Sequence, residues 1–497
     1  MRTVQINQKV LIRFLLILLM IWIVWWPIVT SGNIRMDSDR MIHTPDVALT
    51  QYVREGRIAL VWLLRLFGLD TWRPVRSGVL FLVFFSLSCG LLYFTLRRQT
   101  GWRNLYPDLF LLLYGLSPIW AYHGYFVVQI AAVGLGMMLS ALTACVDIRF
   151  ISRPAARNLR LLWEAAALII LVFTLLIYQS LIVCYLSVLL VMLFCFLLHG
   201  GRISWRKLLP YILRLICSLV IWFVVTRTLH TDHTATNMDV QIRWGVDSLP
   251  HCILRIAQEA GATVLMVTSR YFSLYTLGAV LVLILLLRRR KTHAAGNPWL
   301  CAVFLAMLLL PFGLSVLLGN VTVPRSQFAL QLVAAFLPVC FLAETEGRHR
   351  VLSAVCVAAV VIQTGLAVRL YHSDQVRNAQ DLAAAEAISA ELRETDPSVP
   401  LAFVGVRTME GHPFLTEKAD VYGRSFFEWI YTPDHPTSST IPALRLLTAY
   451  DGRQYEGITS PEQEQEAVAA AGDMPAFPSP GFVRQEPGMV IIKLSNP

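Results

Sequence analysis

Two aspartates follow closely on the first long apolar stretch of the chain. Asp37 and Asp39 are separated by one residue and flanked by Arg35 and Arg40. An ionised carboxylate can take the proton of an attacking hydroxyl group, and neighbouring guanidinium groups favour its ionised form. The same charges would also keep a helix end in water, so the pattern allows either a catalytic base or a solvated loop. The residues that follow favour the base.

A basic and otherwise apolar segment comes next. It runs from Asp46 to Leu69, has a proline at its start, and places Arg54, Arg57 and Arg65 on one predicted helical face. Charge recurs too often for a spanning helix, so we expect a helix that lies along the membrane surface, with Gly56 as a weak point in it. Planar guanidinium groups match phosphate oxygens, which makes a lipid phosphate the expected ligand of these arginines and of Arg325. General contact with anionic headgroups is the alternative interpretation.

The composition is that of a membrane protein. Of the 497 residues, 56% are apolar and only 15% are charged, whereas soluble proteins carry about 25% charged residues. The mean hydropathy is +0.58. These values exclude a soluble enzyme, a disordered tail and a fibrous repeat. About eleven stretches are long enough to span a bilayer, and they lie at 11–30, 77–96, 105–121, 124–146, 161–178, 180–198, 208–228, 272–287, 299–319, 326–343 and 351–370.

The net charge of +10 is explained by topology. Basic residues gather in alternate loops between the predicted spans, as they do in cytoplasmic loops, and the short loops on the other side hold only Arg325. We therefore expect a cytoplasmic N-terminus and no nucleic-acid partner. Loop 31–76, loop 229–271 and the tail then lie outside.

The tail has a different character from the rest of the chain. An alanine-rich acidic stretch at 378–394 predicts a helix, and apolar runs at 400–406 and 489–494 predict strands. We expect residues 1–370 to form a transmembrane domain and residues 371–497 to form a small extracytoplasmic α/β domain.

Ionisable residues are scarce in the predicted spans. Asp108, Glu164 and Arg214 lie near predicted cytoplasmic ends, where we expect them to reach the interface. A coupled transporter would place a carboxylate near the midplane, so this class is disfavoured.

Four residues in outer turns and loops are weaker candidates for contact with a sugar or an acceptor. They are His123, Gln179, Asp232 and His233. Histidine and aspartate at close spacing can hold a divalent metal, but no helix fixes their geometry in loop 229–271, and the nine cysteines show no metal-ligand spacing. We predict no metal site.

The layout resembles the GT-C class of glycosyltransferases and, more narrowly, the GtrII-like O-antigen glucosyltransferase family. The matching features are Asp37-Ser38-Asp39, Glu55-Gly56-Arg57, Tyr178-Gln179-Ser180 and the helix from Asp381 to Glu394 before Val404-Gly405. The resemblance implies a helical polytopic fold in the bacterial inner membrane. It also implies inverting transfer of a hexose, expected to be glucose, from a polyprenyl-phosphate carrier to a surface polysaccharide or lipid-linked glycan.

Under this resemblance, Asp37 or Asp39 is the base and the arginines stabilise the departing lipid phosphate. No cofactor is required, although a divalent metal is compatible with the chemistry. A flippase or carrier for lipid-linked sugars is the main alternative, since it would explain the outer arginines. A polysaccharide polymerase or ligase would be expected to carry more arginines in loop 229–271, which holds only Arg243, Arg255 and Arg270.

Overall fold

The structure is a computed structural model that describes residues 8–102, 105–153, 156–229, 241–265, 274–290, 298–346 and 348–496. Its residues cluster into two compact units. The first contains Met1–Thr30, Leu49–Leu69 and Pro74–Ala367, and the second contains Ser31–Ala48, Asp70–Arg73 and Val368–Pro497. The sequence analysis assigned all of loop 31–76 to the membrane-spanning part. The structure instead groups the start of that loop with the C-terminal residues.

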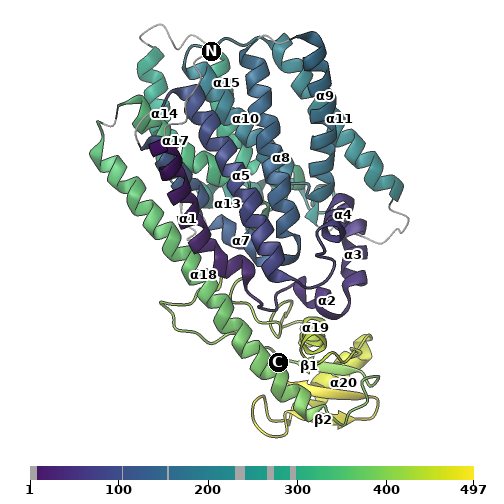
Figure 1. Cartoon of the computed structure of the whole chain (residues 1–497). Coiled ribbons are helices and arrows are strands. Elements are labelled where there is room, and N and C mark those ends of the chain that lie inside the picture. The colour runs from purple at the N-terminus through teal and green to yellow at the C-terminus, as the bar shows by residue number, and fades with distance from the viewer. Residues whose placement is uncertain are drawn as a thin grey trace. The chain divides into compact units, whose positions relative to one another are not determined.

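Long apolar helices make up most of the first unit (Figure 1). Within the described residues, eight helices are long and apolar enough to cross a membrane. They are α1 (Gln8–Thr30), α5 (Pro74–Thr100), α8 (Val127–Ser152), α9 (Arg157–Ile177), α10 (Leu181–Leu198), α11 (Trp205–Leu229), the stretch formed by α15 (Pro298–Leu309), η2 (Leu310–Phe312) and α16 (Gly313–Leu318), and α18 (Arg350–Glu391). Two shorter apolar helices, α14 (Tyr275–Arg290) and α17 (Leu330–Glu344), accompany them.

The predicted span at 105–121 is not one helix. It is divided into α6 (Tyr106–Gly115), which is mostly buried, and α7 (Ile119–Tyr125), which is buried throughout. Pro118 precedes α7, and a proline disfavours the helical conformation of the residue before it. The apolar run is therefore a broken and buried element.

Helix α8 packs against α5, α9 and α10 (Figure 1). Two glycines permit the close approach, because a Cβ atom at Gly134 would lie 2.9 Å from the ring of Phe81 on α5, and one at Gly136 would collide with Leu181 on α10. Small residues at such contacts let helix backbones approach closely in membranes.

A buried charged cluster joins four of these helices. Arg214 on α11 pairs with Asp147 on α8, and it donates to Glu164 on α9 and to the Tyr185 hydroxyl on α10, both at 2.9 Å. Asp147 also accepts from Trp163 at 2.8 Å. The predicted escape of Arg214 to the interface is wrong, because Arg214 is only 5% exposed and its guanidinium group is held between Asp147 and Glu164.

Asp108 departs from the prediction in the same way. It is 5% exposed, accepts a 2.6 Å hydrogen bond from the Tyr93 hydroxyl, and lies 3.3 Å from Arg13. The carboxylate is therefore held between helices α6, α5 and α1.

The second unit is an α/β arrangement around a three-stranded sheet. Its order is β1-β3-β2, with β1 (Leu401–Val404) parallel and β2 (Val483–Glu486) antiparallel to β3 (Met489–Lys493). The other helices of this unit are α2 (Ser38–His43), α19 (Thr440–Asp451) and α20 (Pro461–Ala470), and the predicted helix at 378–394 is the end of α18.

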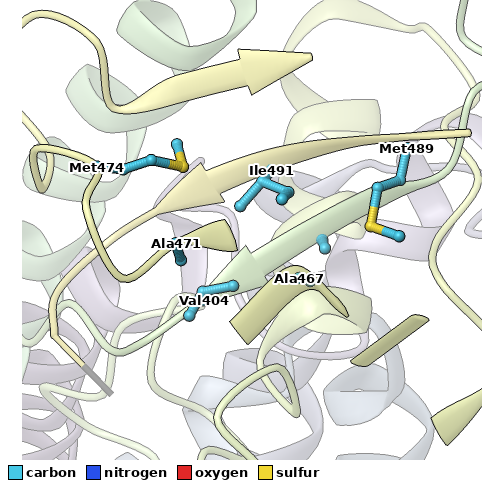
Figure 2. Close-up of a cluster of buried hydrophobic side chains, with 7 residues drawn as sticks. Val404, Ala467, Ala471, Met474, Met489 and Ile491 are labelled. Carbon is cyan, nitrogen blue, oxygen red and sulfur yellow. The ribbon is translucent and has the colours of Figure 1, made fainter. Parts of the chain in front are cut away.

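One face of this sheet packs on α20 (Figure 2). Val404 of β1 and Ile491 of β3 contact Ala467, Ala471 and neighbouring methionines in a buried cluster. A capping box between Ser460 and Gln463 begins α20 and satisfies its first free backbone N–H groups. Apolar burial thus fixes the position of the helix on the sheet.

Candidate active site

The two aspartates occupy a constrained turn at the start of α2. Asp37 directly precedes the helix with φ of 72°, a left-handed conformation that residues other than glycine rarely adopt. The Ser38 hydroxyl ties the turn by accepting from the Arg35 N–H and donating to the Arg35 carbonyl, both at 2.7 Å. As a result, Asp37 is exposed and Asp39 is buried.

Arg35 anchors this turn to α18. Its guanidinium group is fully buried and makes two 2.7 Å contacts with Asp374. Asp374 also accepts from Asn33 at 2.8 Å and from Arg377 at 2.6 Å, and Arg377 donates to the Ile34 carbonyl at 2.8 Å. Arg35 is therefore a positioning residue that orients the two aspartates.

Asp39 has an unusual electrostatic environment. Burial raises its pKa to about 6, and the charge of Asp37 adds to this rise, while Arg445 and Arg40 oppose it. The expected lowering of the pKa by arginines is thus outweighed by burial. Because this pKa is still below 7, Asp39 is mostly ionised at neutral pH. Within the described part of the chain, neither of its buried oxygens forms a hydrogen bond with another side chain.

Arg445 was not singled out from the sequence. It lies on α19, which packs against α2, and its partly buried guanidinium group interacts electrostatically with Asp39 and Asp37. Burial lowers the pKa of Arg445, and Arg40 lowers it further, whereas the two aspartates oppose the shift. The feature that could have pointed to Arg445 is its place in the sequence between Leu444 and Leu446, two residues that are buried in the structure.

The predicted surface helix is two helices. They are α3 (Pro45–Arg54) and α4 (Ile58–Leu66), and the break falls at Gly56, whose φ is +74°. The single helix is thus divided at the residue expected to be its weak point, because glycine readily adopts the left-handed conformation that ends a helix. Arg54 and Arg65 are exposed, whereas Arg57 is turned toward neighbouring helices.

Arg57 joins two motifs that lie far apart in the sequence. Its guanidinium group lies 3.2 Å from both Glu55 and Gln129, and 4.9 Å from the centre of the Tyr178 ring. Gln179 donates to the Glu55 carbonyl at 2.8 Å. The predicted site residues Arg57 and Gln179 are therefore brought together within the first unit.

The loop that carries Arg325 adjoins this cluster. The Tyr178 hydroxyl lies 3.3 Å from Ser326, and the Arg325 guanidinium group stacks 4.6 Å from the centre of the Phe126 ring. His123 is 6% exposed and packs against Phe328 at 4.6 Å between ring centres. Its predicted contact with a sugar stays a prediction.

Glu259 is a second residue that the sequence did not single out. It lies on α13 (Leu249–Val264) in the predicted outer loop, is 8% exposed, and accepts hydrogen bonds from the Ser315 hydroxyl and the Thr322 hydroxyl, both at 2.5 Å. Gln327 donates to it at 3.4 Å. This carboxylate thereby fixes the loop on either side of Arg325.

Three predictions about the site are left without a test. Asp232 and His233 lie outside the described residues. Among the residues that the structure describes, no three histidine, cysteine or acidic side chains are grouped to hold a metal ion. The predicted approach of the aspartates to Arg54 and Arg57 also stays a prediction, because the two sets belong to different units.

Comparison with known proteins adds the family. The family model described as "Glucosyl transferase GtrII" matches residues 26–342, which is more than half of the chain. The chain belongs to the GtrII glucosyl transferase family. The resemblance seen in the sequence is thus confirmed, and this GtrII-family chain is a glycosyltransferase with membrane-spanning helices. The matched range includes both aspartates, Arg57 and Arg325, and it ends before Arg445.

Among solved structures, the GtrII-family chain is similar to ArnT from Cupriavidus metallidurans bound to undecaprenyl phosphate. The identity is 11% and the TM-score is 0.46, over 97% of this chain and 89% of that chain. None of the curated proteins matches the chain.

Proposed function

We propose that the chain transfers a hexose, expected to be glucose, from polyprenyl phosphate to a surface polysaccharide or lipid-linked glycan. The transfer takes place on the outer face of the bacterial cytoplasmic membrane, with the N-terminus inside. The observation that carries the proposal is the Asp37 and Asp39 pair, held in a strained turn within the range that matches the GtrII family.

Asp37 takes the proton of the acceptor hydroxyl in this proposal. It is the exposed member of the pair, and the left-handed turn directs its side chain away from the buried face of α2. As the proton leaves, the hydroxyl oxygen attacks the anomeric carbon from one side. The bond from that carbon to the phosphate oxygen breaks on the other side, so the configuration inverts. Asp39 is the charged neighbour that supports proton uptake.

The departing group is a lipid phosphate, which is stable as an anion and needs positive charge more than a proton. Arg57 and Arg325 are the proposed phosphate ligands, with Arg54 and Arg65 as exposed contacts to the carrier or to other lipid. The support is that Arg57 lies over the Tyr178 ring and that Ser326, the chain neighbour of Arg325, lies 3.3 Å from the Tyr178 hydroxyl. A planar guanidinium group can exchange a carboxylate such as Glu55 for a phosphate without changing its geometry. No metal is required by this chemistry.

An assay in detergent separates the transferase from a carrier. We expect the purified full chain, given labelled glucosyl polyprenyl phosphate and the host's glycan, to form a glycosidic bond without a sealed membrane. A carrier for lipid-linked sugars would form no glycosidic bond, because it only moves its substrate from one side of a membrane to the other. A comparison of the host's surface polysaccharide with and without the chain then identifies the sugar and the acceptor, since the missing side branch names both.

A further inference from the structure

A basic hollow lies where α5, α8 and α10 end. Its volume is about 470 Å³, and it is lined by Thr95, Arg98, Gln99, Cys145, Ile148, Arg149, Ser152, Arg153, Phe196, His199, Gly200 and Gly201. Three guanidinium groups and no carboxylate appear among these lining residues. Two acids adjoin these lining residues and already have partners. Glu344 contacts His199 at 3.2 Å and Trp102 at 3.3 Å, and Asp147 pairs with Arg214 and accepts hydrogen bonds from Trp163 and Tyr185. The hollow therefore offers positive charge to a ligand.

The three helix ends offset only part of that charge. A helix C-terminus carries about half a negative charge. The ends of α5, α8 and α10 together therefore supply roughly 1.5 negative charges, against the three positive charges of Arg98, Arg149 and Arg153. An anion with one or two negative charges would neutralise the positive charge that remains. A phosphate group fits this requirement, and Gln99 and Ser152 add neutral donors beside it.

An apolar groove adjoins the hollow. It has a volume of about 910 Å³, and it is lined by Phe14, Leu18, Leu19, Trp22, Val83, Ser86, Leu87, Gly90, Leu91, Phe94, Thr95, Met138 and Leu142. Thr95 lines both spaces. Along α8, Met138 and Leu142 in the groove are followed one turn later by Cys145 in the hollow, and the Cys145 thiol lies 3.8 Å from the Leu91 carbonyl. The groove is formed by α1, α5 and α8, and along α5 and α8 it continues into the hollow, a path that we call the α5–α8 seam.

This pair of spaces has the chemistry of an amphiphile. A free phosphate would need only the hollow, and an uncharged lipid would need only the groove. We propose that the α5–α8 seam binds an anionic membrane phospholipid, with its phosphate among Arg98, Arg149 and Arg153 and an acyl chain along the groove. Basic pockets between membrane helices on the cytoplasmic side bind such headgroups, and the seam ends on the side predicted to be cytoplasmic.

The phospholipid site is separate from the sugar-transfer site. Gln129, which contacts Arg57, lies near the start of α8, and Arg149 lies near its end. Twenty residues of helix span about 30 Å. The bound phospholipid is therefore a resident lipid and not the sugar donor.

Native mass spectrometry of the full chain in detergent tests the proposal. Phosphatidylglycerol and phosphatidylcholine with the same acyl chains are titrated separately. We expect the anionic lipid to bind more tightly, and the Arg149→Gln, Arg153→Gln double variant to bind it about 25-fold more weakly, since each arginine near a lipid headgroup contributes about fivefold. Arg157→Gln is the matched control, because Arg157 is exposed at the start of α9 and does not line the hollow.

A groove variant distinguishes the lipid from free phosphate. Leu87 is 51% exposed and lines the groove, so Leu87→Trp fills space without disturbing buried packing. We expect it to weaken phosphatidylglycerol binding several-fold. Equal binding of the two lipids, or an equal loss with Arg157→Gln, would overturn the proposal. The hollow would be assigned to free phosphate by two results together. They are thermal stabilisation by inorganic phosphate that equals the effect of the lipid, and lipid binding that Leu87→Trp leaves unchanged. This outcome would also overturn the proposal.

Discussion

At the scale of single residues, burial decides the chemistry of the aspartate pair. Asp37 and Asp39 are separated by a single residue, but the turn leaves the first exposed and the second only 4% exposed. The local charge pattern predicted a pair of acids beside arginines. It could not predict that burial would outweigh the guanidinium charges at Asp39, because burial comes from α19, some 400 residues further along the chain.

The pKa of Asp39 sets an expected pH dependence. Since this pKa is raised to about 6, we expect the rate of sugar transfer to decrease at pH values below 6, where Asp39 takes up one proton. The Asp39→Asn variant should lose this inflection between pH 5 and 7. A rate profile of wild type and variant over this range checks the prediction, and an unchanged inflection in the variant would contradict it.

The same shift has a consequence for stability. The folded-state pKa of about 6 exceeds the ordinary 3.8, so the contribution of Asp39 to stability is complete below about pH 4 and is lost as the pH rises through 6. At pH 8 the buried charge costs about 3 kcal/mol. Asp39→Asn should therefore raise the Tm at pH 8 and leave it nearly unchanged at pH 4.

Arg445 is expected to hold Asp39 in its ionised form. Arg445→Gln removes that opposing charge, so the inflection in the rate profile should move to higher pH, and Arg445→Lys should restore part of it. Arg393 is exposed in the same unit and provides the control as Arg393→Gln. A purely structural role for Arg445 would lower the rate equally at every pH.

At the scale of elements, long apolar runs were predictable and their interruptions were not. The runs at 400–406 and 489–494 contain β1 and β3, but β2 has the sequence Val-Arg-Gln-Glu, which shows no apolar face. Arg214 and Asp147 are 67 residues apart, so no local pattern reveals their pairing. Gly56 divides the predicted surface helix for a reason that lies in its backbone conformation.

The break at Gly56 is expected to position Arg57. Gly56→Ala forces an L residue into a left-handed conformation, and its Cβ atom would lie 2.6 Å from Thr226 on α11. We expect a rise in KM for the lipid donor of about tenfold or more, corresponding to the roughly 1–2 kcal/mol cost of this conformation. Gly101→Ala is the control, because Gly101 has φ of +66° with no atom nearby. An equal effect on transfer at both positions would contradict this role.

At the scale of the whole molecule, the chain forms two units, and its first outer loop contributes to both. The sequence predicted the membrane class and the family, since these depend on composition and on short motifs. It did not predict that Arg35 and Asp374, which are 339 residues apart, would fix the aspartate turn within the second unit. Such pairing depends on the fold.

Loss of Asp374 should destabilise this unit strongly. Asp374→Asn leaves the buried Arg35 and Arg377 without their shared carboxylate, and breaking such a pair costs about 3–5 kcal/mol. We expect a large fall in Tm of the full chain in detergent. Replacing Arg35 as well, as Arg35→Met with Asp374→Leu, should recover only part of the Tm, because the buried Arg377 then keeps Asp381 but not Asp374 as an ionic partner, and transfer should stay impaired.

The central claim is that the carboxylate at the start of α2 takes the acceptor's proton. It is tested by the initial rate of labelled glucose transfer from polyprenyl phosphate by Asp37→Asn and by the Asp37→Asn, Asp39→Asn double variant. Asp434→Asn, an exposed aspartate of the same unit, is the control. The account predicts a fall of about 10²–10⁴-fold for both variants with donor binding retained. Transfer at the wild-type rate by the double variant would contradict it.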